Sequence, residues 1–324
     1  MREDIRDAVE RRHDWNRSEQ IATADDGVEE FHSGFVALVG RPNAGKSTLL
    51  NAIFGKKIAI TSNVVQTTRR RLRAVVNRPG CQIVFVDTPG LHKPQDSLGR
   101  ELNKGALAEL VDVDVVALTV DATKPVGSGD RWVAERVART SAVRVLVITK
   151  ADLATPEMVA SQIAAVAALC DFDETIAVSA TEGFNVEALI EIVSSHLPVG
   201  PHWFPDDAGA DATDEQIVAE FVREKALRRT REEIPHAVGV ACDSLALDGS
   251  LVRAHATILV ERDSQKGILI GSGGEMIKRI GTDARRDLER LFDRKVFLAL
   301  DVRVQPDWRD DGRVIRRLGY GAEA

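Results

Sequence analysis

The sequence has few cysteines and no long apolar run. Its three cysteines, Cys81, Cys170 and Cys242, are widely separated, and no two of them form a CxxC pair. This argues against a zinc site or a disulfide framework and fits a reducing compartment such as the cytoplasm. No apolar run approaches the ~20 residues that a membrane-spanning helix needs, and the first residues lack the apolar core of a signal peptide. We therefore expect a soluble protein, or one that is peripheral to a membrane.

The chain also lacks an excess of basic residues, since its net charge is −7. The acidic side chains, however, are concentrated in two segments. Residues 1–32 carry 5 basic and 10 acidic side chains, and residues 198–215 carry 5 acidic and no basic ones. Residues 216–324 carry 20 basic and 18 acidic side chains. The net charge of the whole chain therefore does not exclude nucleic-acid binding by its C-terminal part.

The residue pattern divides the chain into four segments. Residues 1–32 are predicted to form a charged, mobile extension, with a helix over residues 4–15. Residues 33–197 alternate short β-branched runs with longer amphipathic segments, which predicts an α/β domain with a mostly parallel sheet and helices on both faces. Residues 198–215, with three prolines and two glycines, are predicted to be an acidic linker. Residues 216–324 are predicted to form a smaller α+β domain.

The periodicity also predicts the individual elements. In the first domain we expect strands over residues 35–39, 72–76, 83–86, 113–120, 143–148 and 175–178, and helices over 46–54, 98–110, 130–139, 156–169 and 186–196. In the second domain we expect a helix over 216–233, strands over 238–245 and 252–260, a helix, a glycine-rich turn, a helix over 274–292 and a strand over 296–304. Ligands of parallel sheets bind beyond the carboxyl ends of the strands, so binding motifs are expected there.

The first such motif, GRPNAGKS over residues 40–47, matches GxxxxGK[ST] between a predicted strand and a predicted helix. Its glycines let backbone N–H groups point at phosphates, and the helix N-terminus adds positive potential. Lys46 would supply a charge to the β- and γ-phosphates, and Ser47 one Mg²⁺ ligand. The residues assigned to this loop are Gly40, Arg41, Pro42, Asn43, Ala44, Gly45, Lys46, Ser47 and Thr48.

The second motif is DTPG, formed by Asp87, Thr88, Pro89 and Gly90 and followed by Leu91. An acid at a strand end can hold Mg²⁺ through water, and the Gly90 N–H can sense the γ-phosphate. Between the two motifs lies the polar stretch QTTR. A threonine there, Thr68 in preference to Thr67, would complete the Mg²⁺ shell when GTP is bound. We assign Lys46, Thr68 and Gly90 to catalysis.

Guanine selectivity is predicted from Thr149, Lys150, Ala151 and Asp152, which resemble the NKxD motif of GTPases. A carboxylate at Asp152 can accept hydrogen bonds from the guanine N1–H and 2-amino groups, which adenine lacks. Thr149 stands where asparagine is usual, so the tie from this residue to the phosphate loop is expected to be lost. Ser179 and Ala180, in the loop SATEG, are expected to meet the guanine O6 through the Ala180 N–H.

Slow intrinsic hydrolysis is predicted because Leu91 occupies the position where many GTPases carry a water-orienting glutamine. An aliphatic side chain cannot orient water by hydrogen bonding. A partner or a bound cation would then have to supply the missing charge. Asn43 resembles the residue that holds K⁺ in some relatives, and the alternative that it only shapes the loop stays open.

The C-terminal domain carries a GxxG loop between two helical segments. Such loops let the sugar–phosphate backbone of single-stranded RNA approach closely in KH domains. Apolar residues bracket the loop and basic residues flank it. The residues assigned to RNA binding are Lys266, Ile270, Gly271, Ser272, Gly273, Gly274, Lys278, Arg279, Arg285 and Arg286.

From about Gly34 to Tyr320 the chain resembles the Era family of bacterial ribosome-assembly GTPases. The resemblance rests on GRPNAGKST, QTTRRR, DTPGLHKP, REKALRRTREEIPHAVGV, ERDSQKGILIGSGGEMIKRIG, VFLALDVRVQPDW and LGY. It implies a P-loop G domain and a type II KH domain, binding of GTP and GDP with Mg²⁺, and binding to 16S rRNA near its 3′ end during 30S subunit assembly. It also implies a cytoplasmic monomer with some association with the inner membrane.

The chain departs from this family at Thr149 and in the GxxG loop, which lacks an internal lysine. The missing charge is expected to weaken phosphate contact and its salt dependence. Two alternatives from other classes stay open at this point: a P-loop kinase of small molecules, and a GTPase whose C-terminal domain binds proteins rather than RNA.

Overall fold

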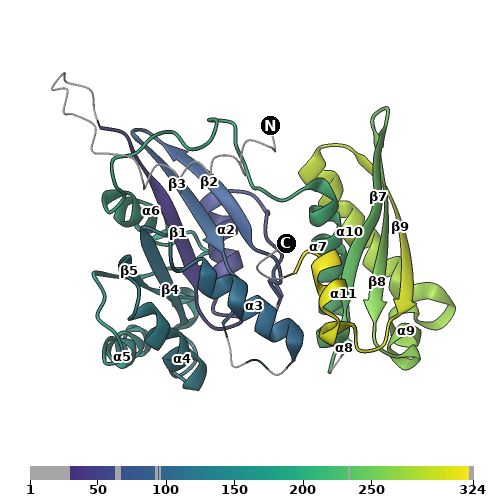
Figure 1. Ribbon diagram of the computed structural model, residues 1–324, viewed down its shortest axis with the longest axis horizontal. Helices are drawn as coiled ribbons and strands as arrows, with labels where there is room; N and C mark the ends of the chain where they lie inside the picture. The colour runs from purple at the N-terminus through teal and green to yellow at the C-terminus, as the bar shows by residue number, and fades with distance from the viewer. Residues whose placement is uncertain (1–29, 63–66, 92–93, 95, 233, 321–324) are drawn as a thin grey trace.

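The computed structural model describes residues 30–62, 67–91, 94, 96–232 and 234–320 of the chain. Most of the predicted N-terminal extension, including its helix, lies outside the described residues, as do Gln66 and His92 of the motifs. The described part forms two lobes side by side, an N-terminal one with a six-stranded sheet and a C-terminal one with a three-stranded sheet (Figure 1).

The N-terminal sheet has the strand order β2-β3-β1-β4-β5-β6, in which only β2 is antiparallel to its neighbour. Four consecutive central strands carry buried β-branched residues along their length, as expected for a sheet covered on both faces. This confirms the predicted mostly parallel α/β fold. The strands are β1 (His32–Val39), β2 (Leu72–Arg78), β3 (Cys81–Asp87), β4 (Val115–Asp121), β5 (Val143–Thr149) and β6 (Glu174–Ala177).

Helices cover both faces of this sheet. Apolar side chains of α2 and α6 form one core with the strands, and those of α3, α4 and α5 form a second core on the opposite face. The first helix ends at Gly55, whose left-handed conformation closes the last turn. The helices are α2 (Lys46–Phe54), α3 (Ser97–Ala108), α4 (Ser128–Val137), α5 (Pro156–Ala167) and α6 (Val186–Ser195).

The segment predicted as a linker packs along the edge of the first sheet. Phe204 is buried in a small core with Phe35 and Val84, and Gly209 O accepts a hydrogen bond from Val75 N at 3.1 Å. The next helix begins at Asp214 rather than at Gln216, because Thr213 caps it and exchanges hydrogen bonds with Gln216. Residues 199–211 therefore extend the first lobe.

The C-terminal lobe places helices on one face of the sheet β7-β8-β9, in which β7 and β8 are antiparallel and β8 and β9 parallel. Its core is formed by α7 and α10 against the strands, in the helix–strand–strand–helix–helix–strand order predicted for a KH domain. The elements are α7 (Asp214–Arg229), α8 (Ile234–Ala237), β7 (Gly239–Asp248), β8 (Leu251–Val260), α9 (Asp263–Ile270), α10 (Glu275–Phe292), β9 (Lys295–Val304) and α11 (Gly312–Arg317).

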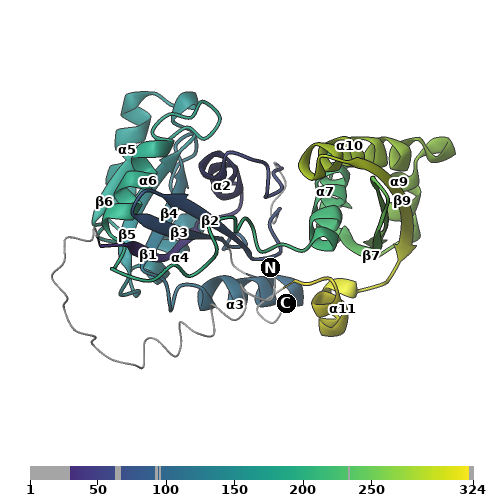
Figure 2. The same cartoon turned by 90° about the horizontal axis from the view of Figure 1, so that it is seen from above.

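The two lobes share a buried apolar contact. Leu98 and Leu102 of α3 pack with Trp308, Ile315 and Leu318 of the C-terminal segment, and α3 and α11 lie close together in both views (Figures 1 and 2). Helix α11 was not predicted, although the apolar spacing of Val314, Ile315 and Leu318 is typical of a short helix. The end of the chain thus belongs to the domain interface.

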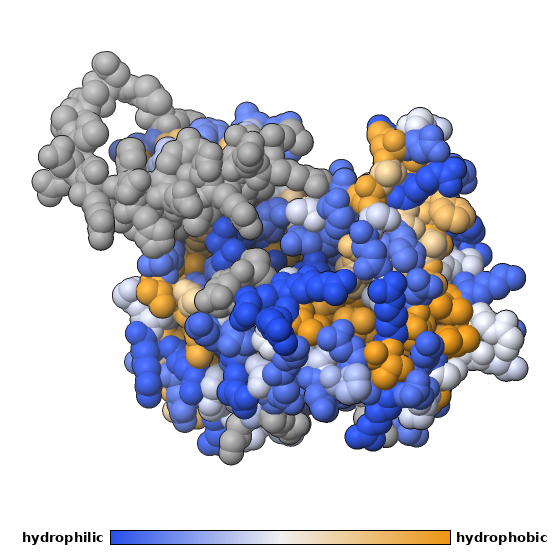
Figure 3. Space-filling view, turned by 45° about the vertical axis from the view of Figure 1, so that its right-hand side comes forward, coloured by the Kyte–Doolittle hydropathy of each residue, from blue (hydrophilic) through white to orange (hydrophobic). Residues whose placement is uncertain are grey.

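The surface of the second lobe shows apolar residues scattered among polar ones (Figure 3). Large exposed apolar side chains there include Leu247, Ile268 and Phe297. Within the described residues, none of the helices combines the length and the apolar character that crossing a bilayer requires.

Candidate functional site

The phosphate loop joins β1 to α2, as the sequence predicts. Lys46, the first residue of α2, is 5% exposed, and its Nζ donates to Gly40 O and Arg41 O at 3.1 Å each. Burial lowers the pKa of Lys46 to about 8, against the opposing effect of Asp87. A buried ammonium group whose hydrogen bonds go only to loop carbonyls is available to an incoming phosphate.

The three residues predicted to hold Mg²⁺ converge beside Lys46. Ser47 Oγ lies 2.7 Å from Asp87 Oδ2 and 2.8 Å from Thr68 Oγ1, whereas Thr67 Oγ1 is hydrogen-bonded to Ser62 Oγ at 2.7 Å. The geometry therefore favours Thr68 over Thr67. Asp87 is fully buried, its Oδ1 has no hydrogen-bond partner among the residues that the structure describes, and burial raises the pKa of its carboxyl. Two hydroxyls and an unsatisfied carboxylate oxygen fit a hard divalent cation such as Mg²⁺.

The loop after β3 passes very close to the phosphate loop. A Cβ atom added to Gly90 would lie 2.8 Å from both the Cα and the N of Pro42, so only glycine fits there. Leu91 N donates to Gly40 O at 3.1 Å, and the Leu91 side chain is fully buried in the core. Leu91 therefore points away from the cavity, and its side chain cannot contact an attacking water.

At the other end of the site, the structure corrects the expectation for Thr149. Thr149 Oγ1 lies 2.7 Å from Ala44 O of the phosphate loop and 3.1 Å from Val120 O. The tie to the loop that was expected to be lost is therefore present, because a short hydroxyl on β5 reaches the loop carbonyl directly. Lys150 Nζ reinforces this tie by donating to Asn43 O at 3.0 Å and to Asp121 Oδ2 at 2.6 Å.

The two predicted base-binding segments lie next to each other. Ala151 N donates to Val178 O at 3.1 Å, which joins the turn after β5 to the start of the SATEG loop. Asp152 is exposed in the short 3-10 helix η1 (Ala151–Leu153). Ser179 is buried, and the next residue, Ala180, is partly exposed. The carboxylate of Asp152 is thus accessible to a base.

A cavity of about 480 Å³ is lined by the phosphate loop, Thr68, Gly90 and Lys150, whereas Asp87, Asp152, Ser179 and Ala180 are not among its lining residues. Six of its lining residues were not assigned to the site from the sequence: Ile60, Thr61, Ser62, Thr67, Thr181 and Arg228. The first four precede Thr68 in a segment without periodicity, and Arg228 comes from α7 of the second lobe. In the sequence, only the cluster of basic residues in α7 could have indicated that Arg228 lines the cavity. The lining residues are Pro42, Asn43, Gly45, Lys46, Ser47, Thr48, Ile60, Thr61, Ser62, Thr67, Thr68, Gly90, Lys150, Thr181 and Arg228.

The GxxG loop lies between α9 and α10. A Cβ atom on Gly271, whose φ is +74°, would lie 2.8 Å from Met276 Cβ, whereas one on Gly273 would meet nothing within 4 Å. Ser272 and Gly273 are exposed, and so are Lys278, Arg279 and Arg285 on α10. Arg279 Nη2 also donates to Glu275 Oε1 at 3.0 Å. The loop and its basic neighbours thus form one accessible surface.

Arg286 is exposed on α10, like Lys278, Arg279 and Arg285. Together with Arg290 and Asp283 of α10 and the basic residues Lys225 and Arg229 of α7, it lines a second cavity of about 480 Å³. Its assignment to RNA binding stays a prediction.

Comparisons with known proteins match both lobes. Residues 35–150 match a family described as 50S ribosome-binding GTPase, and residues 233–309 match the KH domain. The GTPase Era of Geotalea uraniireducens (strain Rf4) is 47% identical over 294 residues, which are 90% of this chain and 99% of that protein.

Two solved structures are similar over the same length. Era in complex with MgGDPNP and nucleotides 1506–1542 of 16S ribosomal RNA is 35% identical with a TM-score of 0.86, covering 90% of this chain and 99% of that one. An Era variant of Aquifex aeolicus bound to GDP and AlF4⁻ is 34% identical with a TM-score of 0.86, covering 90% and 100%.

Proposed function

Because this chain belongs to the Era family of GTPases, we propose that it binds the 3′ end of small-subunit ribosomal RNA under the control of GTP and assists assembly of the 30S subunit. The chain is a GTPase with a C-terminal KH domain, which leaves no support for the small-molecule kinase or the protein-binding module. The observation that carries the proposal is the convergence of Ser47, Thr68 and Asp87 beside Lys46 in a chain whose second lobe carries an exposed GxxG loop.

In the proposed site, different residues of the first lobe bind the phosphates, the base and the metal ion of the GTP complex. Lys46 and the loop N–H groups would neutralise the phosphates, and Asp152 would select guanine. Ser47 and Thr68 would hold Mg²⁺ directly and Asp87 through water. When bound, this ion neutralises charge that develops on the phosphate oxygens. Gly90 N–H would sense the γ-phosphate.

The RNA partner can be tested directly with the RNA segment present in the similar Era complex, nucleotides 1506–1542 of 16S rRNA. We expect this RNA to bind the full chain more tightly with a non-hydrolysable GTP analogue than with GDP, by about tenfold (~1.4 kcal/mol). Filter binding at fixed salt measures the ratio, with an RNA of scrambled sequence as control. Equal affinity for both RNAs in both nucleotide states would refute the proposal.

We further propose that K⁺ stimulates hydrolysis at Asn43. This residue lines the cavity with a backbone φ of +65°, and its carbonyl accepts the hydrogen bond from Lys150. A cation there would stabilise the charge that develops on the phosphates and would so compensate for the missing glutamine at Leu91. We expect GTP turnover to be about tenfold faster in K⁺ than in Na⁺ (~1.4 kcal/mol), and the difference to disappear in Asn43→Ala. Equal turnover in the two salts would eliminate the idea.

We also propose that the chain is a cytoplasmic monomer that associates peripherally with the cytoplasmic face of the cell membrane. The site described above neither requires nor uses a membrane, so this proposal rests on the resemblance to the Era family.

A further inference from the structure

The residue that follows Thr68 is buried in the second lobe. Arg69 is 1% exposed, and its guanidinium donates from Nη1 to Val238 O at 2.7 Å and from Nη2 to His236 O at 3.0 Å. His236 lies in α8, and Val238 lies between α8 and β7. A side chain of the first lobe is thus inserted into the second lobe directly beside a proposed magnesium ligand.

Aromatic rings complete the socket around Arg69. The guanidinium carbon lies 5.6 Å from the ring centroids of both Trp308 and Tyr320, within reach of cation–π attraction. Trp308 is fully buried, and its Nε1 donates to Ala237 O at 2.8 Å, which fixes the ring. The planar fork of arginine suits two carbonyls and two rings at once, and the point charge of lysine does not.

The neighbours of Thr68 and Arg69 are held by the second lobe as well. Arg223 of α7 donates to Thr67 O, and Arg70 donates to Leu318 O. The backbone of Thr67 and the side chains of Arg69 and Arg70, on the two sides of Thr68, are therefore held by the second lobe.

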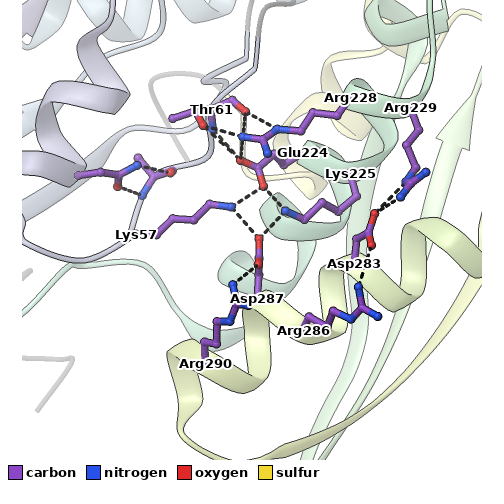
Figure 4. A network of polar contacts seen from close by, with 12 residues as sticks. Lys57, Thr61, Glu224, Lys225, Arg228, Arg229, Asp283, Arg286, Asp287 and Arg290 are labelled. Carbon is purple, nitrogen blue, oxygen red and sulfur yellow. Dashed lines mark hydrogen bonds and ion pairs between the residues drawn. The ribbon is translucent and has the colours of Figure 1, made fainter. Parts of the chain in front are cut away.

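The beginning of the same segment is anchored to the same helix. Thr61 N donates to Glu224 Oε1 at 3.0 Å, and Arg228 Nη2 donates to Thr61 O at 3.0 Å (Figure 4). The carboxylate of Glu224 is fully buried and also accepts from Lys57 Nζ at 2.6 Å. Helix α7 thus holds the segment from Thr61 to Thr67 at its two ends.

By contrast, among the residues that the structure describes, the hydrogen bonds of Thr68 within the first lobe go to groups of the proposed magnesium site. Its hydroxyl reaches Ser47 at 2.8 Å and Asp87 at 3.5 Å, and these are the groups that would share the metal with it. When the side chains of Ser47 and Asp87 bind a metal ion, they no longer hold the Thr68 hydroxyl by hydrogen bonds. The position of the Thr68 backbone is then set by the neighbouring residues, which are held by the second lobe.

We propose that Arg69 is the positioning residue for Thr68, so that the KH domain completes the magnesium site of the first lobe. This inference rests on the proposed function, because it takes Thr68 as a ligand of Mg²⁺ in the GTP complex. Any displacement of the second lobe would then act on Mg²⁺ through Arg69, and withdrawal of Mg²⁺ would act on the second lobe by the same route.

The test is the Mg²⁺ dependence of nucleotide retention by the full chain. Release of a fluorescent, non-hydrolysable GTP analogue is measured by stopped flow over a range of Mg²⁺ concentrations. In Arg69→Lys, which keeps the charge but loses the fork, we expect the Mg²⁺ concentration for half-maximal slowing of release to rise about tenfold (~1.4 kcal/mol). Release without Mg²⁺ is expected to be unchanged.

The matched control is Arg71→Lys. Arg71 lies in the same segment, but its Nη1 contacts Glu109 Oε1 of the first lobe at 2.5 Å, so the Mg²⁺ dependence is expected to stay as in the unaltered protein. An unchanged Mg²⁺ dependence in Arg69→Lys, or an equal shift in both variants, would overturn the inference. Failure of the unaltered protein to bind the analogue at all would instead contradict the proposed function.

A second measurement uses Trp308 as a reporter and needs no change at Arg69. Tryptophan emission is recorded as Mg²⁺ is added to the GTP-analogue complex, in the unaltered chain and in Trp308→Phe. We expect a Mg²⁺-dependent change that the substitution removes. Identical changes in the two proteins would count against the proposal that Mg²⁺ binding is coupled to the second lobe through the residues around Arg69. This measurement can be made even if Arg69→Lys does not fold.

Discussion

Replacement of Lys46 by alanine is expected to weaken GTP binding about 100- to 10,000-fold. Hydrogen bonds to charged groups contribute ~1.5–3 kcal/mol each, and Lys46 is placed to donate to two phosphates. Each loss of ~1.4 kcal/mol lowers the affinity tenfold. Equilibrium titration with a fluorescent GTP analogue at pH 7 measures the effect.

The fold is expected to tolerate this substitution. Burial lowers the pKa of Lys46 to about 8, against the opposing effect of Asp87, so the folded protein disfavours the ammonium charge. The melting temperature is therefore expected to stay close to that of the unaltered protein. Lys56→Ala is the matched control, because Lys56 is exposed and does not line the cavity. Near-normal GTP affinity in Lys46→Ala would contradict the assignment of the phosphate loop.

Much of the first lobe could be predicted because the sequence patterns that indicate it each lie within a short segment of the chain. The glycines and Lys46 of the phosphate loop, the acid at the end of β3 and the buried runs of the strands each lie within a few neighbouring residues. In the second lobe, the end of an element shifted where a cap decides it. The capping pair of Thr213 and Gln216 moved the start of α7 to Asp214.

The contacts between segments could not be predicted in the same way. Thr149 was expected to lose its tie to the phosphate loop, but the distance from its hydroxyl to Ala44 O is set by the register of β5 against β4, which the sequence does not display. The burial of Arg69 depends on Trp308 and Tyr320, more than 200 residues further along the chain. In sequence, Arg69 is one of three consecutive arginines and is indistinguishable from a solvated basic residue.

Substitution of Gly273 by aspartate is expected to have the second largest effect, a loss of RNA affinity of about tenfold or more. Gly273 is exposed at the tip of the GxxG loop, and a Cβ atom there meets nothing within 4 Å. Its φ of +58° lies in the left-handed region, which aspartate and asparagine tolerate better than other side chains. The new carboxylate would thus repel an approaching phosphate without displacing the loop. Filter binding with the RNA of nucleotides 1506–1542 measures the loss.

Gly273→Asn separates charge from shape in this experiment, because it has nearly the size of aspartate and no charge. We expect its RNA affinity to stay within a few-fold of the unaltered protein, and the GTP turnover of both variants to be normal, since Gly273 does not line the nucleotide cavity. Gly271 is unsuitable for this comparison, because any Cβ atom there would collide with the backbone N of Met276 at 2.9 Å and move the start of α10. Unchanged affinity in Gly273→Asp would mean that the RNA backbone does not pass this loop, and an equal loss in Gly273→Asn would assign the effect to bulk rather than to phosphate repulsion.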